Sequence, residues 1–337
     1  MGTLHDYIKW RGDLEFGQDG FNVVDNLVFS CLSYVPMDKV FLGNDAGVID
    51  LQDVNSIYLK TLHDEQKYRE GSVLYDAPLI LRELADTARY RNVKVRNYVS
   101  RIEQDKTLQF AAMEFLLPDG SSYVAYRGTD DSIVGWKEDF MLALEEVEAE
   151  RQAVLFLNSI ASEDDRMLRV GGHSKGGHLA VYAAAMCDPQ IRERILNVYS
   201  NDGPGFMKKI ASSKAMEDIR PKLVSIIPEE SIVGLLMEAV GEPVVVKSSA
   251  LSLSQHNPAT WNVEGKNLIT TDGISSTARF VNRKIENNIS RASDEELNSF
   301  VEDLFSIFEA TGAVTLSDLK KSGLKGIKAM VKKISEI

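Results

Sequence analysis

The sequence predicts an α/β fold in which a mostly parallel central sheet is flanked by helices. Between residues 93 and 248, short apolar runs of strand length alternate with longer stretches of helical periodicity. That alternation is the pattern of strands joined by crossover helices. The 337 residues suffice for one large domain. Apolar residues make up 44% of the chain and charged residues 26%, both ordinary for a soluble globular protein.

Charge and cysteine content exclude several classes of function. The net charge is −12, so we expect no nucleic-acid partner. Only Cys31 and Cys187 occur, which makes a disulfide framework unexpected, and no metal-ligand spacing is found. The sequence therefore implies neither a metal nor another cofactor.

The chain shows no pattern of a targeting or membrane segment. Its first 20 residues contain no apolar core of a signal peptide, and no stretch approaches 18 apolar residues. We expect no stable membrane insertion and a cytoplasmic location. The sequence does not indicate an oligomeric state.

The first third of the chain is predicted to hold two helices and a set of short strands. Residues 1–20 form a lead-in segment, and apolar residues at helical spacing predict helices at 21–32 and 74–90. Strands are predicted at 93–102, 109–117 and 122–127, the last two joined by a hairpin turn at 118–121.

Helices and strands then alternate to residue 248. Helices are predicted at 132–150, 152–160, 176–187 and 232–240, and strands at 167–172, 195–200, 222–227 and 243–248. We divide the chain into an α/β domain, 1–292, and a basic helical appendage, 293–337, packed on the same domain. The 130–160 region is a candidate lid, from its position alone.

The stretch at 168–185, LRVGGHSKGGHLAVYAAA, is the centre of the predicted site. An apolar strand enters Gly172-His173-Ser174-Lys175-Gly176, and an alanine-rich helix leaves it. This is G-x-S-x-G between strand and helix, the nucleophile elbow that exposes a serine hydroxyl on a sharp turn. The glycines are needed because side chains there would crowd the turn. Ser174 is the candidate nucleophile.

A serine hydroxyl needs a base to accept its proton, and the base needs an orienting acid. His173 and His178 lie on the elbow and its helix, and His5 and His63 lie in polar N-terminal stretches. His256 follows the last predicted strand of the sheet, in the chain order Ser…acid…His that this kind of site requires. We therefore predict His256 as the base.

Two strand ends offer an acid. Asp202 follows the strand at 195–200 within a tight D-G-P-G turn, and Glu229 and Glu230 follow the next strand. Both places lie at carboxyl ends of parallel strands, where open α/β sheets build their sites. We favour Asp202 and keep Glu230 as the alternative.

Two backbone or side-chain donors must stabilise the oxyanion that forms when serine attacks a carbonyl. The N–H of the residue after the nucleophile, Lys175, is one. The loop after an earlier strand supplies the other, and Thr129 in Gly128-Thr129 is the candidate, with its hydroxyl as a further donor.

Three stretches carry a resemblance to the class 3 lipase branch of the α/β-hydrolases: YRGTDDSIVGWKEDF (126–140), GGHSKGGHLA (171–180) and SIVG (231–234). Thr129, Trp136 and Ser174 match that branch's oxyanion residue, following tryptophan and nucleophile. The chain resembles more closely a bacterial family of Mbeg-like hydrolases, through VYSNDGPGF (198–206), SIVG and QHNPATW (255–261). The resemblance covers roughly residues 20 to 315.

The chain departs from class 3 lipases at the usual acid. There an aspartate heads a D-I-V-P motif, and here Ser231 stands at that position. The resemblance allows an acid one strand earlier, which adds weight to Asp202.

The resemblance implies an α/β-hydrolase fold and an esterase or lipase acting on a small-molecule or lipid ester. It does not identify the substrate. Two alternatives stay open: a non-catalytic α/β-hydrolase that serves as a binding module, and a thioesterase or peptidase that uses the same three residues.

Overall fold

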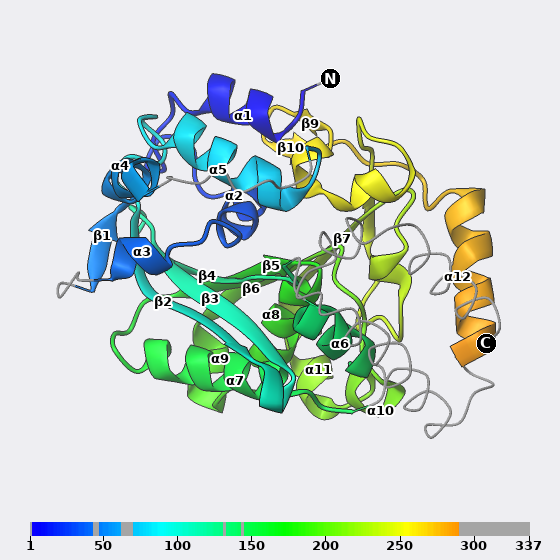
Figure 1. Ribbon diagram of the computed structural model, residues 1–337. Coiled ribbons are helices and arrows are strands. Elements are labelled where there is room, and N and C mark those ends of the chain that lie inside the picture. The colour runs from blue at the N-terminus through cyan, green and yellow to red at the C-terminus, as the bar shows by residue number, and fades with distance from the viewer. Residues whose placement is uncertain (1, 43–46, 62–69, 131–132, 143–144, 290–337) are drawn as a thin grey trace.

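The computed structural model describes residues 2–42, 47–61, 70–130, 133–142 and 145–289 (Figure 1). Within that part, eight strands form one sheet in chain order. They are β1 (Val48–Asp50), β2 (Lys94–Glu103), β3 (Leu108–Leu116), β4 (Ser122–Tyr126), β5 (Leu168–His173), β6 (Ile195–Asn201), β7 (Leu223–Pro228) and β8 (Val244–Val246). A small hairpin pairs β9 (Val263–Glu264) with β10 (Asn267–Leu268).

The sheet is mixed, and its parallel half carries the site. Strands β1 to β4 pair antiparallel, and β4 to β8 pair parallel. The parallel strands need crossover connections, and the helices between them provide these connections. Because parallel strands end at one edge, the residues after β4, β5, β6 and β7 gather there.

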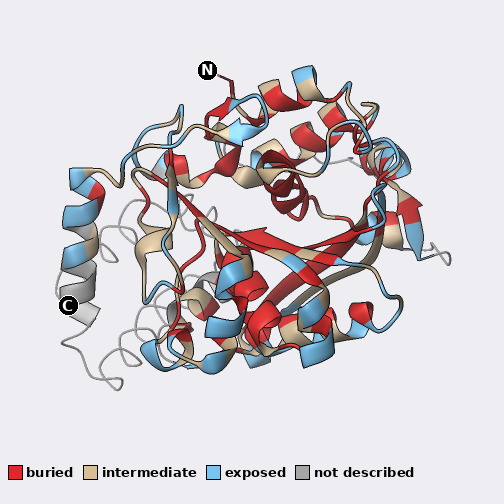
Figure 2. Ribbon diagram, turned by 180° about the vertical axis from the view of Figure 1, so that it is seen from behind, coloured by how far each residue is buried: buried red, intermediate tan, exposed pale blue. Residues whose placement is uncertain are grey.

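Two helical layers cover the sheet, as Figures 1 and 2 show. One face is covered by α1 (Leu4–Arg11), α2 (Val23–Leu32) and α5 (Val73–Leu84), with α3 (Asp38–Phe41) and α4 (Leu51–Thr61) near β1 and β2. The other face is covered by α6 (Ile133–Met141), α7 (Glu148–Ala161), α8 (Lys175–Met186), α9 (Pro189–Arg194), α10 (Lys208–Ala211) and α11 (Lys214–Ile219). Helix α12 (Ser276–Ile289) ends the described chain.

Strand β4 contributes side chains to the hydrophobic cores on both faces of the sheet. Successive side chains of a strand point to opposite faces. Tyr123 and Ala125 belong to the core under α2 and α5, and Val124 and Tyr126 belong to the core under α7 and α8. All four side chains are buried, which makes β4 a central strand with both faces covered.

The predicted fold class is confirmed: the chain has an α/β-hydrolase fold with a serine turn between β5 and α8. The predicted strands correspond to β2 through β8 within a few residues. Helix α1 and strand β1 lie where the sequence predicted a lead-in and an unassigned stretch. The pair β9 and β10 and helix α12 were not predicted.

The prediction of one helix over 132–150 was wrong. The chain leaves α6 after Met141 and begins α7 at Glu148. Two carboxylates accept N–H groups at the N-terminus of α7: Glu138 accepts the Ala149 N–H and Glu150 accepts the Val147 N–H. Both satisfy donors that have no partner within the helix. Helix α7 then packs in the core, and the lid assignment for 130–160 stays a prediction.

The predicted helix at 232–240 was also wrong. Only a 3-10 turn, η3 (Val233–Leu235), forms there. Beyond it, Glu238 exchanges both backbone hydrogen bonds with Phe206, and Met237 has φ +64°. Pairing with the loop after β6 replaces the helix.

No helix in the described ranges is long and apolar enough to cross a membrane. The predicted appendage at 293–337 and His63 lie outside the described residues.

Candidate active site

The elbow is a sharp corner between β5 and α8. Ser174 has φ +57° and ψ −133°, a conformation that costs a non-glycine residue energy. The flanking glycines are required by space. A Cβ at Gly172 would lie 2.4 Å from the Gly176 carbonyl, and one at Gly176 would lie 2.1 Å from the Tyr126 carbonyl oxygen. The motif therefore marks a place where strand, turn and helix backbones touch.

Asp202 lies beside the elbow, at the end of the next strand. His173 pairs with Asn201 in the parallel register, and the Ser174 N–H donates to the Asn201 carbonyl at 3.0 Å. The Asp202 N–H donates to Ile226 of β7 at 2.7 Å. Asp202 is fully buried and has φ +50°. Two neighbouring strand ends thus carry two strained residues, one with a hydroxyl and one with a carboxyl group.

His256 contacts the Asp202 carboxyl group. Its Nδ1 lies 2.6 Å from Asp202 Oδ2, slightly shorter than the ~2.7–2.9 Å typical of charge-assisted N–H···O bonds. An ionised carboxylate only accepts, so Nδ1 carries the proton of this contact, and in the neutral ring Nε2 has the lone pair. The His256 side chain is 31% exposed, whereas that of Asp202 is 1% exposed. The pair therefore has a buried acid end and an accessible base end.

His173 connects the elbow to the His256 loop. Its Nε2 lies 2.7 Å from the His256 carbonyl oxygen, and the two rings are 4.5 Å apart. Burial, with a smaller effect of His256, lowers the pKa of His173 well below its usual range. His173 is therefore neutral, donates from Nε2, and accepts at Nδ1 from the Tyr34 hydroxyl at 2.9 Å. The residue before the nucleophile thus fixes the backbone of the predicted base.

The loop around His256 is tied down on both sides. Gln255 accepts the Glu230 N–H at 3.1 Å, and its carbonyl accepts the Trp261 indole N–H at 2.7 Å. Asn257 donates to Asp76 at 2.5 Å. The QHNPATW stretch therefore supplies anchors as well as the histidine.

The alternative acid, Glu230, is engaged elsewhere. Its Oε2 accepts the Ser252 N–H at 2.5 Å. The structure brings Asp202 to His256 and directs the Glu230 carboxylate into the next loop.

Two other histidines occupy different environments. His178 is buried between Glu150, at 2.9 Å, and the Gly205 carbonyl, at 2.8 Å. His5 contacts Glu83 at 2.7 Å near the N-terminus.

The two predicted oxyanion residues approach the elbow from different elements. Lys175 begins α8, where the first N–H groups have no intrahelical acceptor. Thr129 follows β4, and a Cβ at the adjacent Gly128 would lie 3.2 Å from the Ser174 Cβ. The Thr129 hydroxyl donates to Asp139 at 2.5 Å, so the backbone N–H is the group of Thr129 that we assign as the candidate oxyanion donor.

The Lys175 side chain lies in a buried polar cluster that the sequence did not indicate. Its ammonium contacts Glu138 Oε2 at 2.9 Å and the Gln109 side-chain oxygen at 2.7 Å, and lies 3.7 Å from Asp139. Burial raises the pKa of the Asp139 carboxyl group to about 6, although the nearby Lys175 ammonium acts to lower it. The cluster ties α6 to the first residue of α8.

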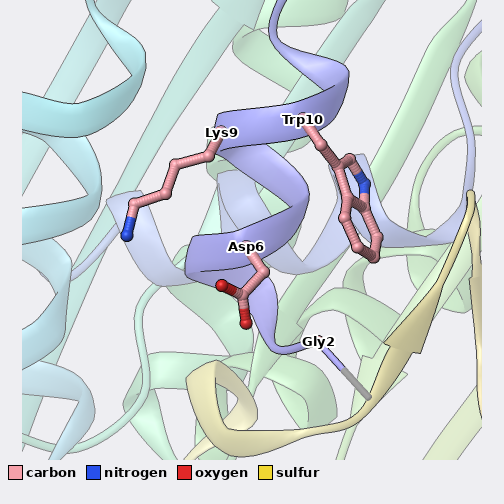
Figure 3. A pocket seen from close by; sticks show the side chains of 4 residues that line it. All are labelled: Gly2, Asp6, Lys9 and Trp10. Carbon is pink, nitrogen blue, oxygen red and sulfur yellow. The ribbon is translucent and has the colours of Figure 1, made fainter.

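A shallow hollow on the surface lies away from these residues. Figure 3 shows Asp6, Lys9 and Trp10 of α1 around it, with Gly2 below. None of the predicted catalytic side chains lines it. Across the described ranges, no group of three or more metal-binding side chains comes together.

The fold and the serine turn define an α/β-hydrolase. The sequence profile of the Mbeg1-like family matches residues 84–306, more than half of the chain. The chain belongs to the Mbeg1-like family, as the resemblance predicted.

Solved structures of lipases are similar to this chain at low identity. A Rhizomucor miehei lipase–propeptide complex is 16% identical, with a TM-score of 0.36, over 46% of this chain and 57% of that chain. M37 lipase is 17% identical, with a TM-score of 0.39, over 62% of this chain and 67% of that chain. The chain thus spans little more than half of the first lipase. No protein of curated function matches. The fold assignment therefore depends on the strand order and elbow of this chain.

Proposed function

We propose that this protein is a serine hydrolase that cleaves carboxylic esters. The observation that carries the proposal is the hydrogen bond between His256 and Asp202, with the His256 ring 4.5 Å from that of His173, the residue before the strained Ser174. A buried carboxylate, an accessible imidazole and a serine on an elbow are the three parts of an activated nucleophile. The chemistry requires no metal and no organic cofactor.

The first half of the reaction forms an acyl-enzyme. Ser174 Oγ attacks the ester carbonyl carbon while His256 Nε2 takes the hydroxyl proton. The backbone N–H groups of Lys175 and Thr129 stabilise the oxyanion. Collapse of the tetrahedral intermediate breaks the bond to the alkoxy oxygen, and His256 returns the proton to the departing alcohol.

The second half releases the acid. Water attacks the acyl carbon, His256 Nε2 accepts a water proton, and the Ser174–acyl bond breaks as that proton returns to Ser174 Oγ. Asp202 holds the Nδ1 proton throughout and stabilises the imidazolium that forms in each half.

A small-molecule or lipid ester is the proposed substrate. A cytoplasmic location, the lack of a nucleic-acid partner and the lack of stable membrane insertion stay predictions from the sequence.

Substrate turnover tests the proposal. Matched ester, thioester and amide substrates with one acyl group should give the highest kcat/KM for the ester, and Ser174→Ala should abolish turnover. A preference for the thioester or amide would assign the same residues to the alternative chemistries. Ester turnover unchanged in Ser174→Ala would contradict the proposal and favour a binding module.

A further inference from the structure

We infer that the turn at 231–234 positions the Asp202 carboxylate, and that Ser231 is a positioning residue for the reaction. The inference deepens the proposed function and rests on it. It concerns the SIVG stretch, which has no role in the mechanism above.

The two oxygens of Asp202 have different partners. Oδ2 faces His256 Nδ1 at 2.6 Å. Oδ1 accepts the Ser231 hydroxyl at 2.5 Å and the Gly234 N–H at 3.1 Å. Asp202 is fully buried, and a buried charge needs hydrogen-bond partners to offset its lost hydration. The turn supplies two of them.

Gly234 is needed for this contact. A Cβ at position 234 would lie 2.5 Å from Asp202 Oδ1 and 3.1 Å from Ser231 Oγ. Only a residue without a side chain lets its N–H approach the carboxylate from this direction. Ser231 and Gly234 therefore act together on one oxygen.

The Ser231 hydroxyl is not the only group that shapes the turn. Backbone bonds from Ser231 to Pro228, from Leu235 to Ile232 and from Leu236 to Val233 form it. Ser231 is 2% exposed, and Oγ also accepts the Gly234 N–H at 3.1 Å. Its one proton is directed to Asp202. The hydroxyl therefore donates to the acid and also accepts one bond within the turn, and the tests below separate these two effects.

Loss of this donor should change the orientation of the acid. The terminal torsion of an aspartate is broad and nearly two-fold, so a carboxylate without fixed partners rotates. Rotation moves Oδ2 away from Nδ1 and weakens control of the His256 tautomer. The substrate need not touch Ser231, so kcat should fall while KM stays unchanged.

Two variants and a matched control test the inference. Ser231→Ala should lower kcat and the rate of fluorophosphonate labelling at Ser174 by ~10–100-fold, the loss expected for a hydrogen bond to a charged group. Ser231→Thr keeps the hydroxyl and should retain most activity. Ser121→Ala is the matched control, because the Ser121 hydroxyl also donates to an aspartate, Asp119, at 2.5 Å. Ser121 lies just before β4, at the end of the strand opposite the candidate site. The Ser121→Ala variant should behave as wild type.

A double-mutant cycle separates positioning from a structural effect. In an Asp202→Asn background, Ser231→Ala should cost almost nothing further, because its only route to the reaction is removed. An equal loss in both backgrounds, or a Ser231→Ala variant as active as Ser121→Ala, would overturn the inference. Should Ser231→Ala not fold, the nearly isosteric Ser231→Cys, whose thiol is a weaker donor, takes its place and should show the same non-additivity with Asp202→Asn.

A spectroscopic readout does not depend on turnover. The downfield proton NMR signal of the His256 Nδ1 proton, assigned by its loss in Asp202→Asn, should shift in Ser231→Ala and stay in place in Ser121→Ala. An unshifted signal contradicts the inference. If the wild type neither labels nor hydrolyses esters, the proposed function fails, and this signal alone decides whether Ser231 orients the carboxylate.

Discussion

His256 and its neighbours show how single residues divide the work of the candidate site. Asp202 is buried and bonded on both oxygens, and His256 contacts it while keeping one ring edge accessible. His173 then fixes the His256 backbone. The environment of each group therefore matches the role that its chemistry would need.

Asp202→Asn should lower kcat by ~10⁴, the loss known for this change in a well-studied triad, because the amide favours the wrong histidine tautomer. Steady-state ester kinetics measure it. Glu230→Gln is the control and should stay near wild type, since Glu230 binds the Ser252 N–H. If Asp202→Asn keeps a kcat near that of wild type while Glu230→Gln is inactive, the acid is Glu230 and not Asp202.

His173 should make stability fall at acid pH. Burial lowers its pKa in the folded protein, while the unfolded chain keeps a value of about 6.5. Below that pH the unfolded state binds the extra proton, so stability is present above about pH 6.5 and declines as pH falls, by about 1.4 kcal/mol per pH unit. Urea unfolding from pH 7 to 5 should show a steeper decline for wild type than for His173→Gln. Equal slopes would contradict a neutral buried His173.

Ser174, His256 and Asp202 could be proposed from the sequence because motif, chain order and strand ends are local features. Their catalytic roles stay predictions. Tyr34, Ser231 and the Lys175–Glu138 pair gave no comparable signal, because each acts through a contact with residues remote in the chain. Of these residues, only Ser231 lies in a stretch, SIVG, that the family resemblance singled out.

Among the elements, close backbone contacts determine the shape of the β5–α8 corner. The conformation of the 232–240 segment is instead determined by pairing with a residue distant in the chain. The glycines at 172 and 176 are visible in the sequence and predict the turn. The apolar residues of 232–240 fit a helix, but pairing of Glu238 with Phe206 decides the outcome. Local pattern therefore predicted the corner and failed for the segment.

Gly176→Ala should damage both fold and activity. The new Cβ would meet the Tyr126 carbonyl oxygen at 2.1 Å and the Gly128 nitrogen at 2.8 Å, and neither backbone atom moves freely. We expect a loss of about 1–3 kcal/mol or more in the free energy of unfolding, typical of overpacking. Gly17→Ala is the control, because no atom lies within 4 Å of its added Cβ. Equal urea midpoints for the two variants would contradict the account of the elbow.

Over the whole molecule, the N-terminal helices belong to the hydrolase fold, although the family match begins at residue 84. Residues from α1, α2 and α5 share one core with β3 and β4. Arg89 and Asp25 form a fully buried ion pair at 2.6 Å within this layer, and the Tyr90 hydroxyl donates to Asp25 at 2.7 Å. The fold class was predicted from the alternation of elements, but the placement of this layer was not.

Arg89→Met should destabilise the protein by about 3–5 kcal/mol, because it leaves the Asp25 charge buried without its partner. Arg91→Met is the matched control: its ion pair with Glu15 is about half exposed, at 49% and 47%, and should contribute at most about 1 kcal/mol. Urea unfolding measures both. Similar small losses would show that the N-terminal layer does not depend on the buried pair.

The central claim is that Ser174 is activated by His256, and covalent labelling with a fluorophosphonate probe, mapped by mass spectrometry, tests it most directly. We predict one adduct, on Ser174, formed by wild type and lost in His256→Ala while both proteins remain folded. No adduct on folded wild type, or an adduct on Ser174 that forms equally fast in His256→Ala, would contradict the claim.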